Sequence, residues 1–336
     1  MGSIENKVEV SIRVASNDGN DAEVLRSLIQ ELANFQKMSD GPKLSANHLR
    51  EHMKNGAANA LIAAVTEGNE TTVAGYAIYY VAPSTQFGKV FFLEDLYIRP
   101  MFRRRKAGSG FMSELMKISR DLSCDAMHWN VLSDNDSAIC FYKSLGAQDL
   151  TFKRSDGLPE LLCWRIESAD YDKAIRSSKD TLPDIKMTVV MLNDVTEENA
   201  VQLIECWKSL DVFSPPFAAE KQFTKMLRDF RFGVVQAQNV TDDAVLGMAL
   251  FHRCAFSTWT GPYITIDSIR VRPDHRRRGI GKKLSTEIVR IAMKHFCSRI
   301  GWTARADSEA KAFFNTMGAI NLTEKEGWLL FQLIAS

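Results

Sequence analysis

Residues 88–101 read GKVFFLEDLYIRPM, and residues 261–274 read GPYITIDSIRVRPD. The two stretches begin with glycines 173 residues apart, Gly88 and Gly261, and their prolines keep the same offset. In both, a β-rich run ends at the proline and a run of three arginines follows shortly after it. Self-similarity at a fixed offset indicates an internal repeat.

Two more pairs of segments repeat in the same order. Residues 73–80 (VAGYAIYY) match residues 245–252 (VLGMALFH), and residues 138–148 (AICFYKSLGAQ) match residues 310–320 (AKAFFNTMGAI). A chain of 336 residues has room for two domains of this kind. We therefore predict an N-terminal domain, a polar linker and a C-terminal domain, at residues 7–166, 167–184 and 185–336.

Hydrophobic periodicity predicts the elements of the first copy. Period-two or β-rich runs indicate strands at 8–14, 60–66, 73–81, 90–98 and 126–132. Helical spacing indicates helices at 20–36, with Asn20 and Glu23 placed as a capping box, and at 108–122. The second copy repeats the pattern, including a strand at 187–191 and a helix at 196–210. Each copy is thus predicted to be an α/β unit around a mixed sheet.

Composition narrows the class of protein. Apolar residues make up 45% and charged residues 25%, which is typical of a soluble globular protein. A net charge of +1 argues against a dedicated nucleic-acid or membrane-surface protein. The six cysteines are scattered singly without metal-ligand spacing, so we expect reduced thiols, no metal and a cytoplasmic location. We expect neither a membrane span nor a signal peptide.

The segment after the repeated proline carries the clearest binding signal. Residues 271–292 read VRPDHRRRGIGKKLSTEIVRIA, a strand end followed by an Arg- and Gly-rich turn and then a helix. Main-chain N–H groups in such a turn, together with the N-terminus of the helix, form a cradle for a pyrophosphate. Gly279 and Gly281 let the backbone approach a ligand closely.

The pattern Arg276-x-x-Gly279-x-Gly281 resembles the coenzyme A loop of the GNAT superfamily of N-acetyltransferases. The resemblance implies two tandem GNAT-type domains that use acetyl-CoA. The first copy reads Arg103-x-x-Lys106-x-Gly108 in register, with lysine where the first glycine belongs. A frame shifted by two residues restores the glycine, but helix spacing favours the unshifted frame. Whether Lys106 adds a phosphate contact or crowds the loop stays open.

Cofactor binding is expected at the loops, at the strands before them and at one asparagine that the resemblance supplies, Asn135. The expected residues of the first copy are Leu96, Tyr97, Ile98, Arg103, Arg104, Arg105, Lys106, Ala107, Gly108, Ser109 and Asn135. Those of the second copy are Ile269, Val271, Arg276, Arg277, Arg278, Gly279, Ile280, Gly281 and Lys282.

Residues 9–152 also resemble the diamine (spermidine/spermine) and thialysine N-acetyltransferases, in segments such as 88–98 and FYKSLGAQDL at 141–150. That resemblance implies that Tyr142 is the general acid, and that Glu94 and Asp95 are the acidic pair at the site. Acids expected at two substrate positions are replaced by Gln36 and Ser84. This favours a smaller amine, such as thialysine, a diamine or a lysine-like amino acid, as much as spermidine, and a peptide or protein N-terminus stays open as acceptor.

Elementary chemistry fits these roles. An ammonium group has no lone pair, so a carboxylate such as Glu94, acting through water, must collect its proton before the amine can attack. Backbone N–H groups of the strand can hold the thioester oxygen as it gains charge. The departing thiolate then takes a proton from Tyr142, since a phenol and a thiol differ by only about 1.5 units of pKa.

The second copy keeps its loop and loses the acid. Phe314 stands in place of Tyr142, Asp307 in place of Asn135, and Asp267 answers Glu94. Three readings stay open: catalysis by the first domain, catalysis by the second through Asp267, or a non-catalytic coenzyme A-binding module. The expected partners are a small amine and no nucleic acid or membrane; the tandem could form an internal pseudodimer, and a homo-oligomer stays open.

Overall fold

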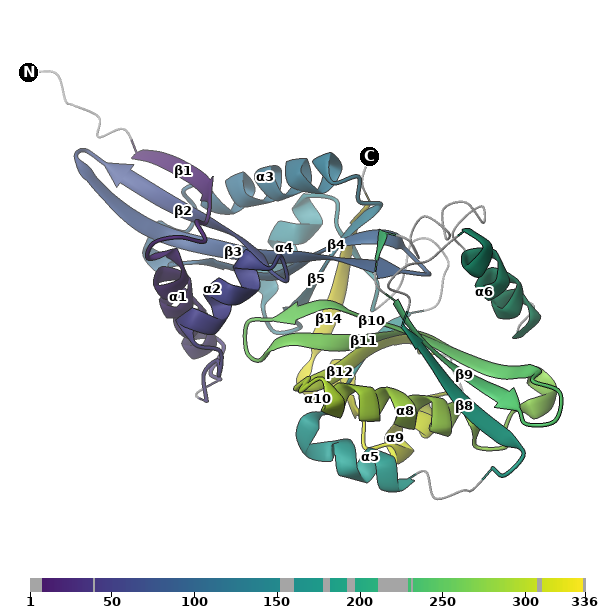
Figure 1. The fold of residues 1–336 in the computed structure, drawn as a ribbon. Helices are drawn as coiled ribbons and strands as arrows, with labels where there is room; N and C mark the ends of the chain where they lie inside the picture. Colours follow the sequence, from purple (N-terminus) through teal and green to yellow (C-terminus); the bar gives the residue numbers. More distant parts are fainter. Residues whose placement is uncertain are drawn as a thin grey trace, which may run out of the picture.

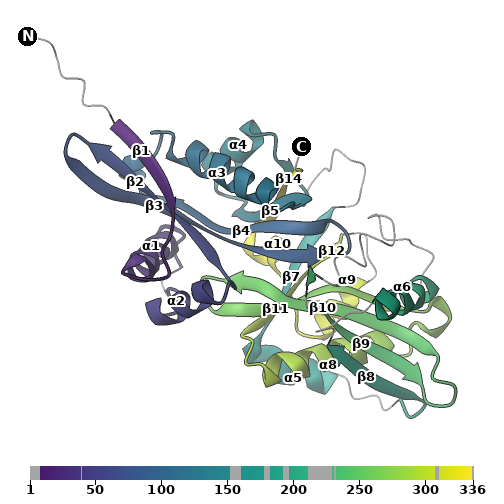
Figure 2. The same ribbon diagram turned by 45° about the horizontal axis from the view of Figure 1, so that its top comes forward.

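The computed structural model describes residues 8–38, 40–151, 160–177, 182–191, 197–210, 229–230, 232–306 and 310–334. These residues form two seven-stranded mixed sheets. Each sheet is flanked by helices, and the two sheets form two lobes that lie against each other (Figures 1 and 2). The predicted α/β class with two tandem units is therefore confirmed.

The first sheet has the order β1-β2-β3-β4-β5-β14-β6. Its strands from the first repeat are β1 (Val8–Val14), β2 (Asn59–Glu67), β3 (Glu70–Ser84), β4 (Gly88–Ile98), β5 (Ala126–Leu132) and β6 (Gln148–Asp149). The helices are α1 (Asp21–Phe35), α2 (Ala46–Lys54), α3 (Ala107–Asp121) and α4 (Asp136–Ser144), with the 3-10 turn η1 (Pro100–Phe102) before α3. Helices α1 and α2 lie on one face of the sheet and α3 and α4 on the other (Figure 1).

The second sheet has the order β13-β7-β12-β11-β10-β9-β8. Its strands from the second repeat are β8 (Ile185–Met191), β9 (Phe232–Asn239), β10 (Val245–Ser257), β11 (Gly261–Val271), β12 (Arg299–Arg305) and β13 (Ile320–Asn321). The helices are α5 (Tyr171–Ser177), α6 (Glu197–Leu210), α8 (Ile280–Lys294), α9 (Ala310–Thr316) and α10 (Leu322–Glu326), with the 3-10 turns η2 (Ser168–Asp170) and η3 (Pro273–His275). The predicted linker is therefore helical from Ser168 to Ser177.

The two halves exchange a strand. Strand β7 (Leu161–Glu167) follows the first repeat in the chain, yet it pairs with β12 and β13 of the second sheet. Strand β14 (Trp328–Ile334), shown in yellow in Figure 1, pairs with β5 and β6 of the first sheet. The sheets thus cross the predicted division of the chain at 166 and 185. Backbone groups make the strand pairing. Strands β7 and β14 can therefore each pair at the equivalent position of either sheet, and local sequence does not decide between the two sheets.

The start of α1 departs from the predicted capping box. Asn20 is the N-cap residue, but its side chain makes no capping hydrogen bond. Instead Asp21 accepts a hydrogen bond from the Ser16 N–H at 2.7 Å, and it also pairs with the Arg13 guanidinium. Glu23 pairs with Arg50 of α2 rather than reaching back to the helix start. The carboxylate of Glu23, which the capping box would use at the helix start, is therefore paired with Arg50 of α2.

One hydrophobic core is shared between the lobes. The face of the first sheet under α1 and α2 packs residues such as Leu28 and Tyr76, and the same cluster contains Ala255 and Phe256 of β10. The hydroxyls of Tyr80 in β3 and Tyr263 in β11 lie 3.3 Å apart. The lobes therefore meet through β3, β4, β10 and β11, which are the strands that carry the repeated segments.

Candidate active site

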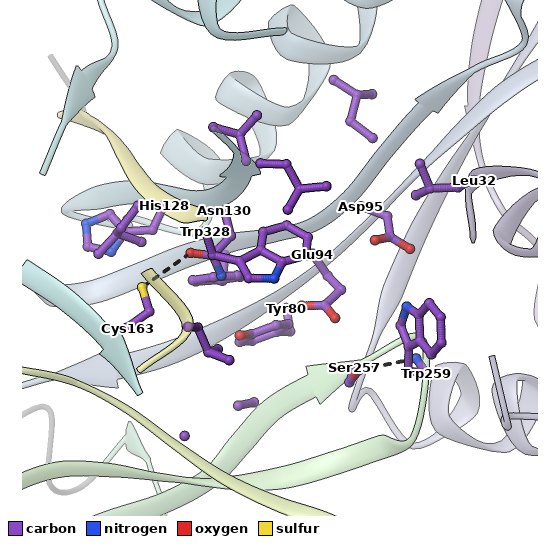
Figure 3. Close-up of a pocket in the computed structure, with 18 of the residues that line it drawn as sticks. Leu32, Tyr80, Glu94, Asp95, His128, Asn130, Cys163, Ser257, Trp259 and Trp328 are labelled. Carbon is purple, nitrogen blue, oxygen red and sulfur yellow. Dashed lines mark hydrogen bonds between the residues drawn. The ribbon is translucent and has the colours of Figure 1, made fainter. Parts of the chain in front are cut away.

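A cavity of about 1270 Å³ lies where the two lobes meet, and residues of both line it. Figure 3 shows part of it, with Glu94 and Asp95 on β4, Ser257 at the end of β10 and Trp259 in the turn that follows. The predicted substrate residues Gln36, Ser84 and Asp95 line this cavity, as do Glu94, Asn135 and Tyr142. The predicted reacting groups thus all belong to the wall of one cavity.

A β-bulge sets the position of Glu94. In the β3–β4 ladder Asp95 pairs with Ile78 and Leu93 pairs with Tyr79, so Glu94 is the extra residue without a partner. A bulge re-aims the side chain of the unpaired residue. Asp267 is the extra residue at the equivalent step of β11, between Ile266 and Ser268.

Strands β4 and β5 separate beyond the bulge. Their parallel pairing covers Val90–Leu93 against Ala126–Trp129 and then stops. Residues 96–98 of β4 still pair with β3, and Leu96, Tyr97 and Ile98 line the cavity on the open side of the strand. In the second sheet the matching ladder is shorter still, with pairs only at Ile264 and Thr265. Such a gap exposes backbone groups of a central strand, which a ligand can use.

Burial dominates the electrostatics of Glu94. Desolvation raises the pKa of its carboxyl group to about 8, although the Arg299 guanidinium opposes that shift. The ionised neighbour Asp95 raises it, while the Thr258 backbone and the Ser257 hydroxyl lower it through hydrogen bonds. Ser257, Thr258 and Arg299 all belong to the second half, so the environment of this carboxyl is built by both halves.

Asp95 is held by the core beneath the sheet. The Tyr76 hydroxyl donates a hydrogen bond to Asp95 Oδ2 at 2.8 Å. Burial raises the pKa of the Asp95 carboxyl, and bonds from Tyr76 and Thr258 act against that rise. This acid is therefore fixed in one orientation at the cavity wall.

Tyr142 on α4 lines the cavity inside an aromatic cluster. Its ring centroid lies 4.8 Å from that of Trp129 on β5 and 6.2 Å from that of Phe331 on β14. Burial raises the pKa of its phenol well above the ordinary value, and the charge of Asp95 adds to the rise. The hydroxyl therefore keeps its proton throughout the physiological pH range.

The first loop adopts the unshifted frame. Turn η1 ends at Phe102, Arg104 and Lys106 take left-handed φ angles of 60° and 65°, and α3 begins at Ala107. In the second loop Arg277 and Gly279 take φ angles of 64° and 86°, and α8 begins at Ile280. Lys106 thus occupies the position of Gly279.

Most of the predicted cofactor residues of the first loop face the cavity. These are Arg103, Arg104, Lys106, Gly108 and Ser109. Arg105 is an exception, because its guanidinium pairs with Glu67 and lies 5.7 Å from the Phe102 ring centroid. Ala107 is buried beneath the loop. A Cβ at Gly108 would be in van der Waals contact with Ile98 and Phe141 at 3.5 Å, so the start of the helix is closely packed at this residue.

A family model described as the acetyltransferase (GNAT) family matches residues 26–147 and, separately, residues 193–319. The chain belongs to this family. Members of the GNAT family take the acetyl group from acetyl-CoA, and the open β4 edge with the loop before α3 fits that carrier. Within the described residues no cluster of His, Cys, Asp and Glu could hold a metal ion.

Curated relatives resemble one half of this GNAT chain. The thialysine N-epsilon-acetyltransferase of Bos taurus is 35% identical over 148 residues, which are 42% of this chain and 86% of the relative. The protein of the same name from Caenorhabditis elegans is 37% identical over 152 residues, 45% of this chain and 89% of the relative. The human spermidine/spermine N(1)-acetyltransferase-like protein 1 is 32% identical over 141 residues, 40% of this chain and 20% of the relative. The chain is an acetyltransferase.

Solved structures share the tandem fold. A tandem GNAT protein from the clavulanic acid biosynthesis pathway aligns with a TM-score of 0.56 over 98% of this chain and 99% of that one, at 14% identity. A GCN5-related N-acetyltransferase from Sphaerobacter thermophilus aligns with a TM-score of 0.54 over 97% and 96% of the two chains, also at 14% identity. These likenesses concern the fold alone.

The Arg- and Gly-rich loop of the second GNAT copy, residues 276–282, lies outside the cavity. Predicted residues 269, 271 and 276–282 do not line it. The side chain of Arg276 donates to the Val271 carbonyl at 3.1 Å, as Arg103 does to Ile98 at 3.0 Å. Arg278 donates to Asp184 at 2.5 Å. A Cβ at Gly281 would meet only Val271, at 3.9 Å, so the packing at this glycine is looser than at Gly108.

The reacting groups of the second copy are altered or covered. Phe314 packs against Trp302 at 5.0 Å, in the place that Tyr142 takes beside Trp129. Asp267 Oδ1 accepts a hydrogen bond from the Thr85 N–H at 3.0 Å, and burial raises the pKa of its carboxyl to about 6. Asp307 lies outside the described residues.

Sequence reasoning missed the groups that the second half gives to the first site. Ser257 and Thr258 are the repeat partners of Ser84 and Thr85, so the contacts Thr85–Asp267 and Thr258–Glu94 are two versions of one pseudo-twofold contact. No local motif marks them. Arg299 has no such signal either, because the matching position in the first half is Ala126.

Proposed function

We propose that the first half transfers the acetyl group of acetyl-CoA to the primary amine of a small diamine or lysine-like acceptor. One observation carries the proposal: the bulged carboxylate, the open strand edge, the buried tyrosine and the cationic loop of the first half all line one cavity. The names of the relatives point to acceptors of this chemical class.

The carrier would lie along the open edge of β4. Its diphosphate would meet the main-chain amides of residues 104–108, with the charges of Arg103, Arg104 and Lys106 around it. Asn135, whose Oδ1 caps α4 by accepting from the Ala138 N–H at 3.3 Å, lines the same path. When bound, the carrier supplies a thioester acetyl group to the amine.

The residues of this chain would then handle protons and charge. In its ionised form Glu94 takes a proton from the ammonium through water. A pKa raised to about 8 makes that form a stronger base than an exposed carboxylate, and it is populated as the pH approaches 8. The N–H groups of residues 96–98 stabilise charge on the thioester oxygen. Tyr142 holds the proton that the departing sulfur needs, because burial keeps its phenol neutral. The same burial makes the phenol a weaker acid than an exposed tyrosine, so it gives up the proton only as negative charge builds on the sulfur beside it.

Asp95 would receive the amine. Gln36 and Ser84 also line the cavity, where this branch of the family is expected to carry acids. The Ser84 hydroxyl is already engaged, since it accepts from the N–H groups of Gln86 and Phe87 at 3.2 Å. Without acids at these two positions, this part of the wall favours a small amine over a long polycation.

The Tyr142→Phe variant tests which half reacts. We expect it to lose roughly 10²–10⁴-fold in kcat, the contribution of a general acid, with unchanged acetyl-CoA binding by calorimetry. Thiol release with a panel of amines measures the turnover. Unchanged turnover would move catalysis to the second half, and carrier binding without any amine consumed would leave a binding module.

A second candidate role rests on the loop of the second half. Gly279 and Gly281 complete the pattern that Lys106 interrupts in the first loop. We infer that this half binds coenzyme A without transferring the acetyl group, because Phe314 has no proton to give and Thr85 covers Asp267.

The exchanged strands support the interpretation of the two halves as an internal pseudodimer. The six unpaired cysteines suit a reducing cytoplasm. None of the described helices is long and apolar enough to cross a membrane.

A further inference from the structure

Arg299 is a cation of the second half in the wall of the proposed acceptor site. It is the first residue of β12, lines the cavity, and has a side chain only 17% exposed. Its Nη2 lies 3.9 Å from Glu94 Oε1. The guanidinium thus stands beside the proposed base, although it comes from a part of the chain that the first repeat does not contain.

The hydrogen-bonding capacity of Arg299 is only partly used. The separation of 3.9 Å from Glu94 is longer than a charge-assisted hydrogen bond, which spans about 2.7–2.9 Å. The guanidinium carbon lies 4.2 Å from the Tyr263 ring centroid, and Nε is buried without a hydrogen-bond partner among the described residues. Arg165 in the same wall has closer ion pairs, with N–O separations of 2.5 Å to Glu167 and 3.0 Å to Glu326.

A buried guanidinium with donors left over from its hydrogen bond to the Tyr263 hydroxyl selects among acceptors. It repels a second ammonium group, so it disfavours a diamine or polyamine near Glu94. It attracts a carboxylate, which it can bind through two parallel N–H groups. The site therefore presents Asp95 to a cationic end and Arg299 to an anionic end, which matches a zwitterion.

We propose that Arg299 binds the carboxylate of an amino-acid acceptor whose terminal amine is acetylated at the first site. This inference rests on the proposed function and adds the acceptor class to it. The acceptor is then an amino acid with a side-chain amine, not a simple diamine. Because Ala126 stands at the repeat position of Arg299, the pair Arg299 and Glu94 occurs in the first site alone.

A matched pair of substrates tests the proposal in the full-length protein. Thialysine and its decarboxylated analogue, bis(2-aminoethyl) sulfide, differ only in the carboxylate. We expect the wild-type kcat/KM to favour thialysine by roughly 10-fold or more, the worth of a hydrogen bond to a charged group. In Arg299→Gln we expect that ratio to fall to about one or below, mainly through a higher KM for thialysine.

The ratio of the two substrates cancels indirect effects. Removing Arg299 also changes the pKa of Glu94, but that change acts on both substrates alike. Arg299→Lys keeps the positive charge but loses the two parallel N–H donors, so it should retain part of the preference for thialysine. If Arg299→Gln does not bind acetyl-CoA, the substrate ratio is measured with Arg299→Lys instead. Arg253→Gln, an exposed arginine on β10 outside the cavity, should leave both substrates unchanged.

Two results overturn the assignment of Arg299. One is a wild-type protein that acetylates both amines equally well, and the other is a variant in which both rates fall by the same factor. A wild-type protein that acetylates neither amine refutes the proposed function itself, which separates the two failures.

Discussion

Glu94 is a buried carboxyl group whose charge depends on both halves of the molecule. Its folded-state pKa of about 8 lies above its ordinary value of 4.5. A raised carboxyl pKa means that the folded state binds the proton more tightly than the unfolded chain does. Its contribution to the free energy of unfolding is therefore fully present below pH 4.5 and is lost as the pH rises through 8.

This linkage predicts the behaviour of Glu94→Gln. Glutamine resembles the neutral carboxyl and cannot ionise, so the variant and the wild type should have similar free energies of unfolding near pH 5. Above pH 8 the variant should be the more stable one. Denaturant unfolding between pH 5 and 9 measures the difference. Asp95 also titrates in both proteins, so the test is the difference curve, and a flat difference would contradict the prediction.

At the scale of the element, the loop between β4 and α3 shows how a repeat diverges without changing shape. Lys106 holds a left-handed φ of 65° where its counterpart is Gly279 at 86°. The left-handed region costs a non-glycine residue about 1–2 kcal/mol. The strained residue Lys106 places its ammonium group at the cavity, where Gly279 has no side chain.

The exchange of these residues between the loops is testable. Lys106→Gly should raise the free energy of unfolding by up to about 1 kcal/mol, and should raise the KM for acetyl-CoA because a cation at the cavity is lost. The reverse change, Gly279→Lys, should lower the stability by a similar amount. Denaturant unfolding and steady-state kinetics give both quantities. A less stable Lys106→Gly protein would show that the lysine side chain supports the loop.

The elements were predictable where the pattern was strong. Strand β5 was predicted at its observed bounds and α3 within one residue, because periodic apolar runs ended at clear turns. Helix α2 was missed, since its short polar sequence buries only Leu49 and Met53. The unshifted loop frame followed from helix spacing, whereas the outward turn of Arg105 depends on Glu67, which is distant in sequence.

At the scale of the whole molecule, the halves are joined by contacts that a repeat pattern does not reveal. The turns after β3 and β10 each reach the bulged acid of the other half. The equivalent strands β7 and β14 each complete the sheet of the other half. Repetition predicts two similar units, but it cannot tell which unit receives a repeated strand. The first site therefore depends on residues after 250, which the sequence assigned to another domain.

The strand exchange predicts that a residue near the C-terminus controls the first site. Phe331 on β14 is fully buried, and its ring centroid lies 6.1 Å from that of Trp129 and 6.2 Å from that of Tyr142. Phe331→Ala should lower the free energy of unfolding by about 3–5 kcal/mol, as expected for a large buried side chain. It should also lower the kcat for amine acetylation, because Tyr142 loses a packing partner. Denaturant unfolding and thiol-release kinetics measure the two effects.

Two further variants show where the loss arises. Ile334→Ala changes the exposed end of the same strand, where the side chain is 65% exposed, and should alter neither quantity. Trp164→Ala lies on β7, directly after the first repeat in the chain, and it opens the core of the second sheet beside Trp302 and Phe314, although Trp164 also reaches the cavity wall. If each exchanged strand supports the site of the sheet with which it pairs, Phe331→Ala should lower the rate of acetylation more than Trp164→Ala does. The opposite order would mean that catalysis follows the order of the chain and not the pairing of the strands.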